Sequence, residues 1–382
     1  MVKLAVVCDL VEEGWPSMDL VAEMLLENLR NGHADSIIAT RVCPPMRKRL
    51  VTIRPTSRFL FNTDRLVNRL WDYPRHVSRL RHKFDLFHLV DHSYSQLVHY
   101  VRPDRTVITC HDLDTFRCLL EPQQDQRSWP FSLMTKYILS GFRKAAKVVC
   151  DSNAVREQLL AYGLFPQDRV EVVTLGTHPV YSPKPNALAD AETMRLLSYP
   201  QPDNIGILHV GSTIARKRID ILLRVFNSLR REFPAAKLIR IGGPFTESQS
   251  ALIEQLNLAE SIIVLSNISR DVLASIYRRA TLVLQPSERE GFGFPVVEAM
   301  ACGTPVVASD INVLREVGGD AVTYCPMGDV CAWSEKVTEL LNEKSERPEQ
   351  WNRRSERGVE QASKFSWAEY TRKMVSVYER LL

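Results

Sequence analysis

The 382-residue sequence lacks the features of a membrane-spanning or disulfide-stapled protein. No apolar run approaches the roughly 20 residues that a transmembrane helix needs, so we expect no such helix. The eight cysteines form no Cys-x-x-Cys pair and several stand in apolar segments, so we expect neither disulfides nor a zinc site. The first residues hold a short apolar run followed at once by acids, unlike a secretory signal. These absences favour a cytoplasmic globular protein.

Strong overall charge is also absent, because the formal net charge is only +4. The distribution is uneven, however, and the segment 41–83 holds many Lys and Arg residues against only Asp64 and Asp72. The basic residues of this segment are Arg41, Arg47, Lys48, Arg49, Arg54, Arg58, Arg65, Arg69, Arg75, Arg79, Arg81 and Lys83. They favour peripheral contact with a membrane or an anionic, lipid-linked acceptor over nucleic acid. A solvated face balanced by acids from elsewhere in the chain is the alternative.

Short β-branched segments alternate with longer segments of helical periodicity along the whole chain. The predicted strands are 3–10, 35–42, 85–91, 105–112, 147–152, 169–176, 204–211, 236–243, 261–267, 281–287 and 304–310. This alternation predicts an α/β fold with two Rossmann-like, doubly wound parallel-sheet domains that face a cleft. Ligands bind such sheets at the carboxyl ends of the strands.

Proline and polar residues mark the predicted division of the chain. Residues 181–203 are expected to be a linker, with one helix near 187–197. The predicted N-terminal domain is therefore 1–180 and the predicted C-terminal domain 204–364, followed by an amphipathic helix in 365–382. Another helical segment, 64–83, is expected to break near Pro74.

The clearest chemical pattern is the string SEREGFGFPVVEAMACGTPVVASD at 287–310. Glu290 follows a predicted strand, and Glu298 lies one turn into the following helix. Between them, a glycine-rich turn and a helix start comprise Gly291, Phe292, Gly293, Phe294 and Pro295. Glycines let backbone N–H groups approach a ligand, and a helix N-terminus favours a diphosphate. Two carboxylates can accept hydrogen bonds from sugar and ribose hydroxyls, so the pattern indicates a nucleotide-sugar site.

This string closely resembles the E-x7-E signature of the family 4 retaining glycosyltransferases, which have the GT-B fold. The resemblance covers most of the chain and implies that a sugar moves, with retention, from a nucleotide-diphosphate donor to a glycan, lipid-linked or other hydroxyl acceptor. It implies no metal and no other cofactor. The most similar branches are mannosyltransferases, so GDP-mannose is favoured as donor, with UDP-glucose and UDP-GlcNAc as alternatives.

The resemblance also implies roles for individual residues. LHVGSTIARKRIDILLRVF, at 208–226, is similar to the family's segment that brings basic residues, here Arg216 and Lys217, to the donor diphosphate. VITCHDLDTF, at 107–116, is similar to the strand end at which His111 approaches the donor sugar. Glu290 would hold sugar hydroxyls and Glu298 the ribose. Further donor contacts are expected from Gly14, Gly211, Ser212, Asn267 and Ile268.

The resemblance also bears on the terminal helix and on Arg218. The terminal helix is similar to the family's C-terminal helix, which crosses back to the first domain. Many relatives have Asn or Gly where this sequence has Arg218, so its role stays open.

The sequence leaves two alternatives to glycosyl transfer. A phosphorylase or epimerase of the same fold is less favoured, since no lysine motif for pyridoxal phosphate is evident. A non-catalytic protein that binds nucleotide sugars or polyanions is the other alternative. Intact Glu290, Glu298, Lys217 and His111 argue against it.

Overall fold

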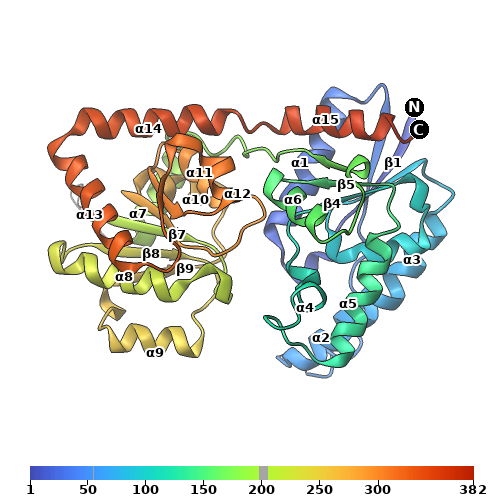
Figure 1. Ribbon diagram of the computed structural model, residues 1–382, viewed down its shortest axis with the longest axis horizontal. Helices are drawn as coiled ribbons and strands as arrows, with labels where there is room; N and C mark the ends of the chain where they lie inside the picture. Colours follow the sequence, from blue (N-terminus) through green and yellow to red (C-terminus); the bar gives the residue numbers. More distant parts are fainter. Residues whose placement is uncertain (55, 198–204) are drawn as a thin grey trace. The chain divides into compact units, whose positions relative to one another are not determined.

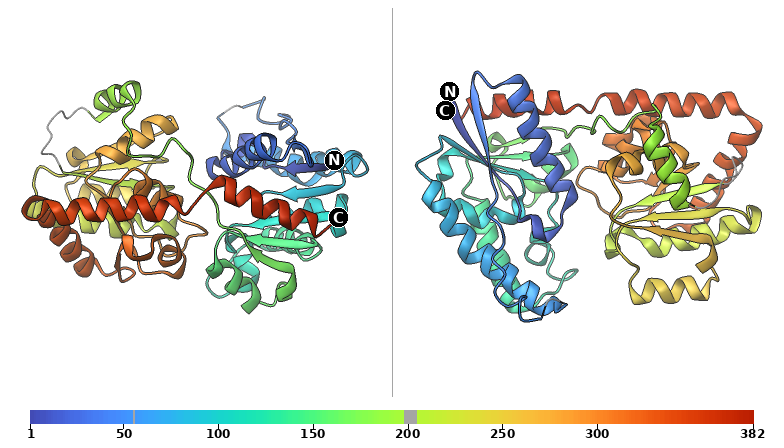
Figure 2. Two further views of the ribbon diagram at one scale, coloured as in Figure 1. Left: turned by 90° about the horizontal axis from the view of Figure 1, so that it is seen from above. Right: turned by 180° about the vertical axis from the view of Figure 1, so that it is seen from behind.

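The computed structural model describes residues 1–54, 56–197 and 205–382, in two compact units (Figures 1 and 2). Unit 1 comprises Met1–Gly176 and Trp367–Leu382, and unit 2 comprises Thr177–Ser366. The end of the predicted linker and the first residue of the strand predicted at 204–211 lie outside the described residues. In the described part, no helix is long and apolar enough to cross a membrane.

The sheet of unit 1 has six parallel strands in the order β2-β1-β3-β4-β5-β6. The strands are β1 (Val2–Val7), β2 (Ile37–Val42), β3 (Leu86–Leu89), β4 (Thr106–Cys110), β5 (Lys147–Cys150) and β6 (Val170–Val172). Strands β2 to β6 each lie inside a segment predicted as a strand, and β1 begins one residue before the segment predicted at 3–10. Because the chain proceeds outward in opposite directions from β1 and β3, the switch point of this sheet lies between them.

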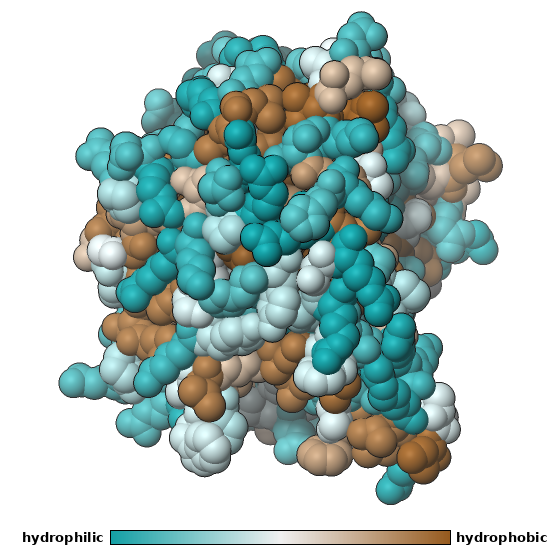
Figure 3. Space-filling model, turned by 90° about the vertical axis from the view of Figure 1, so that its right-hand side faces the viewer, coloured by the Kyte–Doolittle hydropathy of each residue, from teal (hydrophilic) through white to brown (hydrophobic). Residues whose placement is uncertain are grey.

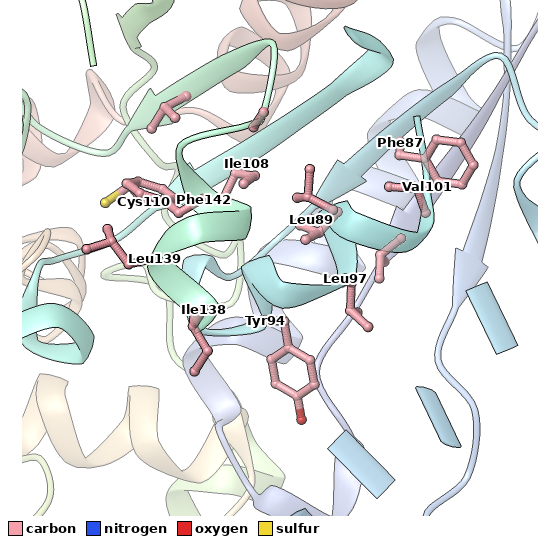
Figure 4. Close-up of a cluster of buried hydrophobic side chains, with 14 of the residues drawn as sticks. Phe87, Leu89, Tyr94, Leu97, Val101, Ile108, Cys110, Ile138, Leu139 and Phe142 are labelled. Carbon is pink, nitrogen blue, oxygen red and sulfur yellow. The ribbon is translucent and has the colours of Figure 1, made fainter. Parts of the chain in front are cut away.

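Helices cover both faces of this sheet. One face carries α1 (Pro16–Gly32) and α15 (Trp367–Glu379). The other carries α3 (Tyr73–Leu80), the 3-10 segment His92–Tyr100 and α5 (Trp129–Phe142), which enclose the apolar cluster of Figure 4. The remaining helices are α2 (Arg58–Val67), α4 (Arg117–Leu120) and α6 (Asn153–Ala161).

The terminal helix α15 is tied to the sheet of unit 1 by a buried polar contact. The Tyr378 hydroxyl lies 2.7 Å from His88 Nδ1 on β3, and His88 Nε2 lies 2.8 Å from the Thr109 hydroxyl on β4. All three side chains are buried. The chain end is thereby an integral layer of unit 1.

The helix predicted to break near Pro74 continues through it. Helix α2 passes into a π-helical segment, Asn68–Asp72, and then into α3, in which Pro74 stands in the first turn. Proline has no N–H and its ring clashes with the carbonyl four residues earlier. The wider π turn accommodates that ring, so the predicted break is wrong.

The sheet of unit 2 also has six parallel strands, in the order β12-β11-β10-β7-β8-β9. The strands are β7 (Gly206–Val210), β8 (Lys237–Ile241), β9 (Ile262–Leu265), β10 (Leu282–Gln285), β11 (Val306–Ser309) and β12 (Thr323–Cys325). The short edge strand β12 is not predicted from the sequence. The predicted α/β class and the two doubly wound parallel sheets are confirmed. The switch point of this sheet lies between β7 and β10.

Helices α8 (Ile219–Glu232) and α13 (Val330–Glu346) cover one face of the second sheet. The other face carries α10 (Arg270–Arg279) and α11 (Phe294–Ala301). The helix predicted near 187–197 is confirmed as α7 (Ala187–Leu197), and it packs on α10, where Asp190 accepts hydrogen bonds from Ser275 and Arg278. The other helices are α9 (Glu247–Gln255), α12 (Asn312–Gly318) and α14 (Pro348–Ser363).

Candidate active site

The loops after β7 and β10 flank the switch point of unit 2, where ligands bind in open α/β sheets. The first loop carries Arg216 and Lys217, and the second carries Glu290. Their backbones are joined, because the Glu288 N–H donates to the Arg216 carbonyl at 2.8 Å. The fold therefore places these predicted residues together at the expected edge of the sheet.

Lys217 and Glu290 form the centre of this cluster. Lys217 Nζ lies 2.6 Å from Glu290 Oε1, and Arg216 Nη1 lies 3.4 Å from Glu290 Oε2. Gln285 Nε2 donates to the same Glu290 Oε1 at 2.7 Å. Burial opposes ionisation of the Glu290 carboxyl, but Lys217 and Arg216 outweigh it and lower its pKa to about 2. An ionised glutamate therefore holds both cations in place.

Arg218 has a backbone conformation that is uncommon for arginine. Its backbone is left-handed, with φ 47° and ψ 51°, at the junction between the loop and α8. Asn and Gly adopt this region most readily, so arginine here carries a conformational cost. Here the guanidinium offsets the cost by donating to Glu288 at 2.7 Å and to Asp220 at 2.9 Å. Arg218 thus braces the loop that carries Lys217.

The turn before α11 requires glycine at one position. Gly293 has φ 98°, and a Cβ there would lie 2.8 Å from the Leu314 side chain. Pro295 stands in the first turn of the helix, where the missing N–H removes no intrahelical hydrogen bond. A helix N-terminus presents backbone N–H groups and a positive dipole end, which favour a diphosphate.

Glu298 occupies a different environment from Glu290. Its carboxylate accepts a hydrogen bond from the Tyr277 hydroxyl at 2.9 Å, also interacts with the Tyr181 hydroxyl, and feels the charge of Arg270. Burial raises the pKa of the Glu298 carboxyl to about 7. The two glutamates of the E-x7-E string therefore differ in charge near neutral pH.

His111 lies in unit 1, after β4, and both of its ring nitrogens are occupied. Nδ1 lies 2.5 Å from Asp151 Oδ2, and Nε2 lies 2.7 Å from the Val90 carbonyl oxygen. Burial disfavours the imidazolium, but Asp151 outweighs it and raises the pKa of His111 to about 9. The ring is thus a protonated donor to two protein acceptors, with no ring nitrogen left for a sugar.

The remaining predicted residues lie at the same sheet edges. Gly14, with φ 69°, follows a short 3-10 turn after β1 in unit 1. In unit 2, Gly211 directly follows β7, where its N–H donates to the Ile241 carbonyl, and Ser212 is exposed beside it. Asn267, in a left-handed conformation, and Ile268 follow β9.

Both halves of the sequence match models of known protein families. Residues 20–179 match the family model described as Glycosyltransferase Family 4, and residues 198–358 match that described as Glycosyl transferases group 1. O-antigen chain mannosyltransferase B of Escherichia coli is 30% identical over 288 residues, which are 73% of this chain and 71% of that protein. The chain belongs to glycosyltransferase family 4. The predicted family is thereby confirmed.

Other relatives match this family 4 chain over less of their own length. D-inositol 3-phosphate glycosyltransferase of Mycolicibacterium smegmatis is 29% identical over 248 residues, 63% of this chain and 54% of that protein. The chain thus spans about half the length of such relatives.

Solved structures of the same fold cover the whole chain. Sucrose-phosphate synthase from Thermosynechococcus elongatus has a TM-score of 0.75 at 20% identity, over 100% of this chain and 99% of that one. Anabaena HepE in complex with UDP and glucose has a TM-score of 0.74 at 15% identity, over 100% of both chains. The predicted GT-B fold is confirmed by these neighbours.

Sequence reasoning on this family 4 chain missed several polar residues around the predicted ones. They are Asp151, Tyr181, His209, Arg240, Tyr277 and Gln285. A usable signal existed for His209, Arg240 and Gln285, since each is a polar residue inside an otherwise apolar strand. Tyr181 and Tyr277 offer no such signal, because tyrosine is common in cores.

Proposed function

We propose that this chain transfers a sugar, with retention, from a nucleoside diphosphate donor to a hydroxyl acceptor. The observation that carries the proposal is the Arg216–Lys217–Glu290 cluster beside the start of α11, at the switch point of unit 2. Cations and a helix N-terminus at one sheet edge suit a diphosphate leaving group. Family membership gives the reaction class.

The chemistry assigned to the cluster is stabilisation of the departing diphosphate. Arg216 and Lys217 would neutralise the charge that develops on it, together with the helix start near Pro295, without a divalent metal or other cofactor. The backbone amides from Gly291 to Phe294 and the Glu290 carboxylate would hold sugar hydroxyls. No protein nucleophile is assigned, and the leaving phosphate would accept the proton of the acceptor hydroxyl.

The Glu298 carboxylate would hold the ribose, and Asn267 and Ile268 would meet the base. Gly211 and Ser212 would lie against the donor in unit 2. Gly14 and His111 are the proposed contributions of unit 1. Because both ring nitrogens of His111 are engaged, its proposed part is to hold the Asp151 carboxylate and the Val90 carbonyl group in place.

GDP-mannose is the favoured donor, since the E. coli relative is named as a mannosyltransferase. A UDP-sugar is the alternative, because HepE, of the same fold, is seen with UDP and with UDP-glucose. The expected acceptor is a glycan, a lipid-linked molecule or another hydroxyl compound.

Retention can be tested without knowledge of the acceptor. Enzyme incubated with GDP-α-mannose or UDP-α-glucose should slowly transfer the sugar to water. Proton NMR taken before mutarotation should show the α-anomer of the free sugar first, and EDTA should leave the rate unchanged. Initial release of the β-anomer would overturn retention, and a rate abolished by EDTA would overturn metal independence.

We also propose that the basic segment 41–83 contacts an anionic membrane surface. Among its described residues, the cations with carboxylate partners are Arg41, Arg47, Arg49 and Arg69. The two acids of the segment are already engaged: Asp64 accepts three backbone N–H bonds from residues 49–51, and Asp72 pairs with Arg49 at 2.8 Å. In the described part of the chain, the cations that carry no ion pair are Lys48, Arg54, Arg58, Arg65, Arg75, Arg79, Arg81 and Lys83.

Exposed apolar side chains accompany these cations. Phe59 is 76% exposed and Trp71 is 58% exposed, and the Arg75 guanidinium stacks on the Trp71 ring at 3.0 Å. The face of the molecule in Figure 3 shows apolar atoms near its upper edge and, separately, at its lower edge, which is at the level of α2 in Figure 1. Aromatic rings among free cations suit the headgroup region of an anionic bilayer.

The prediction is binding to phosphatidylglycerol vesicles at low salt. At about 1 kcal/mol per basic residue, changing Arg58, Arg75 and Arg79 to Gln should weaken sedimentation with these vesicles by roughly a hundredfold. Changing exposed Arg372 of α15 to Gln is the control and should have little effect. Equal binding to neutral phosphatidylcholine vesicles, or none at low salt, would contradict the proposal.

A further inference from the structure

Two polar side chains lie inside the apolar core of unit 2, at the strand ends that carry the candidate site. His209 of β7 and Arg240 of β8 are register partners, as are Ile207 and Leu238 two residues earlier. Since partners in a parallel sheet project to the same face, both side chains lie on the side of α8 and α13. Both have no exposed surface.

The Arg240 guanidinium has few partners, among them the Phe245 ring, whose centroid lies 5.8 Å from Cζ. Its Nη1 donates to the Ile241 carbonyl oxygen at 2.6 Å, while Nε and Nη2 have no hydrogen-bond partner among the described residues. Neither ring nitrogen of His209 has one either. Burial lowers the pKa of Arg240 to about 10, with no carboxylate acting on it, so it stays charged at neutral pH.

An uncompensated charge in this position is costly. The effective penalty for burying an ion amounts to several kcal/mol unless a counter-charge and hydrogen bonds offset it. Burial, then Arg240 and Lys217, lower the pKa of His209 well below its usual range, so His209 is neutral and supplies no counter-charge. The described part of unit 2 therefore lacks the anion that this site requires.

Two glycines separate the guanidinium from the candidate site. A Cβ at Gly242 would overlap both Arg240 Nη1 and the Gly211 carbonyl oxygen. A Cβ at Gly211 would in turn lie 3.4 Å from the His209 ring and 3.7 Å from Lys217 Cε. The backbone of Gly242 thus lies against Arg240 and Gly211, and Gly211 lies beside Lys217.

We propose that Arg240 is a positioning residue of the donor site, whose unpaired charge beneath Gly211 and Gly242 attracts the donor diphosphate without touching it. This inference rests on the proposed function of the same site. Glu290 already cancels part of the charge of Arg216 and Lys217, whereas no carboxylate of the described residues cancels that of Arg240. A buried charge acts through a low dielectric and is weakly screened by salt.

The test compares affinity with stability in Arg240→Met. Calorimetry with UDP and GDP should show roughly tenfold weaker binding of the diphosphate that the wild type prefers, at low and at high salt. Affinity for the parent nucleoside, uridine or guanosine, should not change. The thermal midpoint of the ligand-free variant should equal or exceed that of the wild type, because a buried unpaired charge has been removed. Arg231→Met, an exposed arginine of α8, is the control and should change neither quantity.

Several outcomes would overturn the proposal. Unchanged diphosphate affinity removes Arg240 from the site, and equal losses for nucleoside and diphosphate indicate a structural role instead. A large drop in the thermal midpoint, or failure of both Arg240→Met and Arg240→Gln to fold, also indicates a structural role for Arg240. If the wild type binds no nucleoside diphosphate at all, the proposed function fails together with this inference, whereas normal wild-type binding with an unaffected variant overturns this inference alone.

Discussion

Lys217→Ala lowers the rate of sugar transfer by a factor of roughly ten to a thousand, the range seen when one donor to a developing negative charge is removed. Lys217 Nζ lies 2.6 Å from Glu290 and its side chain is only 10% exposed, so the amine is held in one place before the donor arrives. Release of the nucleoside diphosphate from GDP-mannose or UDP-glucose measures the effect, with water as acceptor.

The matched control for this variant is Lys336→Ala. Lys336 lies on α13, where its exposed side chain pairs with Glu339 at 2.5 Å. Its removal should leave turnover unchanged. Since Arg216 still faces Glu290 after loss of Lys217, the variant should remain folded, and circular dichroism checks this. A folded Lys217→Ala enzyme with the wild-type rate would remove Lys217 from the leaving-group role.

Glu298→Gln raises stability at pH 8 and weakens donor binding. The folded-state pKa of Glu298, about 7, exceeds its ordinary value of 4.5, so the folded protein binds the extra proton between these values. Stability of the wild type therefore falls as pH rises from 4.5 to 7, and the penalty is complete above 7. Glutamine carries no charge, so its gain should be on the order of 2 kcal/mol at pH 8 and small at pH 5.

The affinity of Glu298→Gln for the donor should fall, although its stability rises. A carboxylate accepts hydrogen bonds from ribose hydroxyls about twice as strongly as a neutral group does. Glu298→Gln should therefore lower the affinity for the donor by roughly tenfold. Glu349→Gln is the control, because Glu349 is 89% exposed. A variant that is less stable than the wild type at pH 8, or that binds donor equally well, contradicts the assigned role.

The sequence predicts the sheets and the glycine turn because both depend on local pattern. Apolar β-branched runs mark nearly every strand, and the GFGFP string marks the point at which Gly293 adopts φ 98°. The pairing of Lys217 with Glu290 follows once β7 and β10 are neighbours. The family resemblance supplied the roles that local pattern leaves open.

Other features escaped prediction for physical reasons. Helix α14 buries only Gly358 and Ala362, so it has no apolar stripe to detect. The Asp151 contact that occupies the His111 ring joins residues 40 positions apart, which no local pattern encodes. The lack of hydrogen-bond partners for Nε and Nη2 of Arg240 depends on what surrounds them in the folded core, and a single arginine in a strand does not reveal that.

The most direct test of the central claim is a thermal-shift panel of the wild-type protein with UDP, GDP, ADP, dTDP and their common sugars, without metal. A nucleotide at about a hundred times its dissociation constant stabilises the folded state by roughly 2.7 kcal/mol, which raises the midpoint by a few degrees. The account predicts such a shift with GDP or UDP and a much smaller one in Glu298→Ala. If no nucleotide raises the midpoint, unit 2 holds no donor site and the proposed transfer is contradicted.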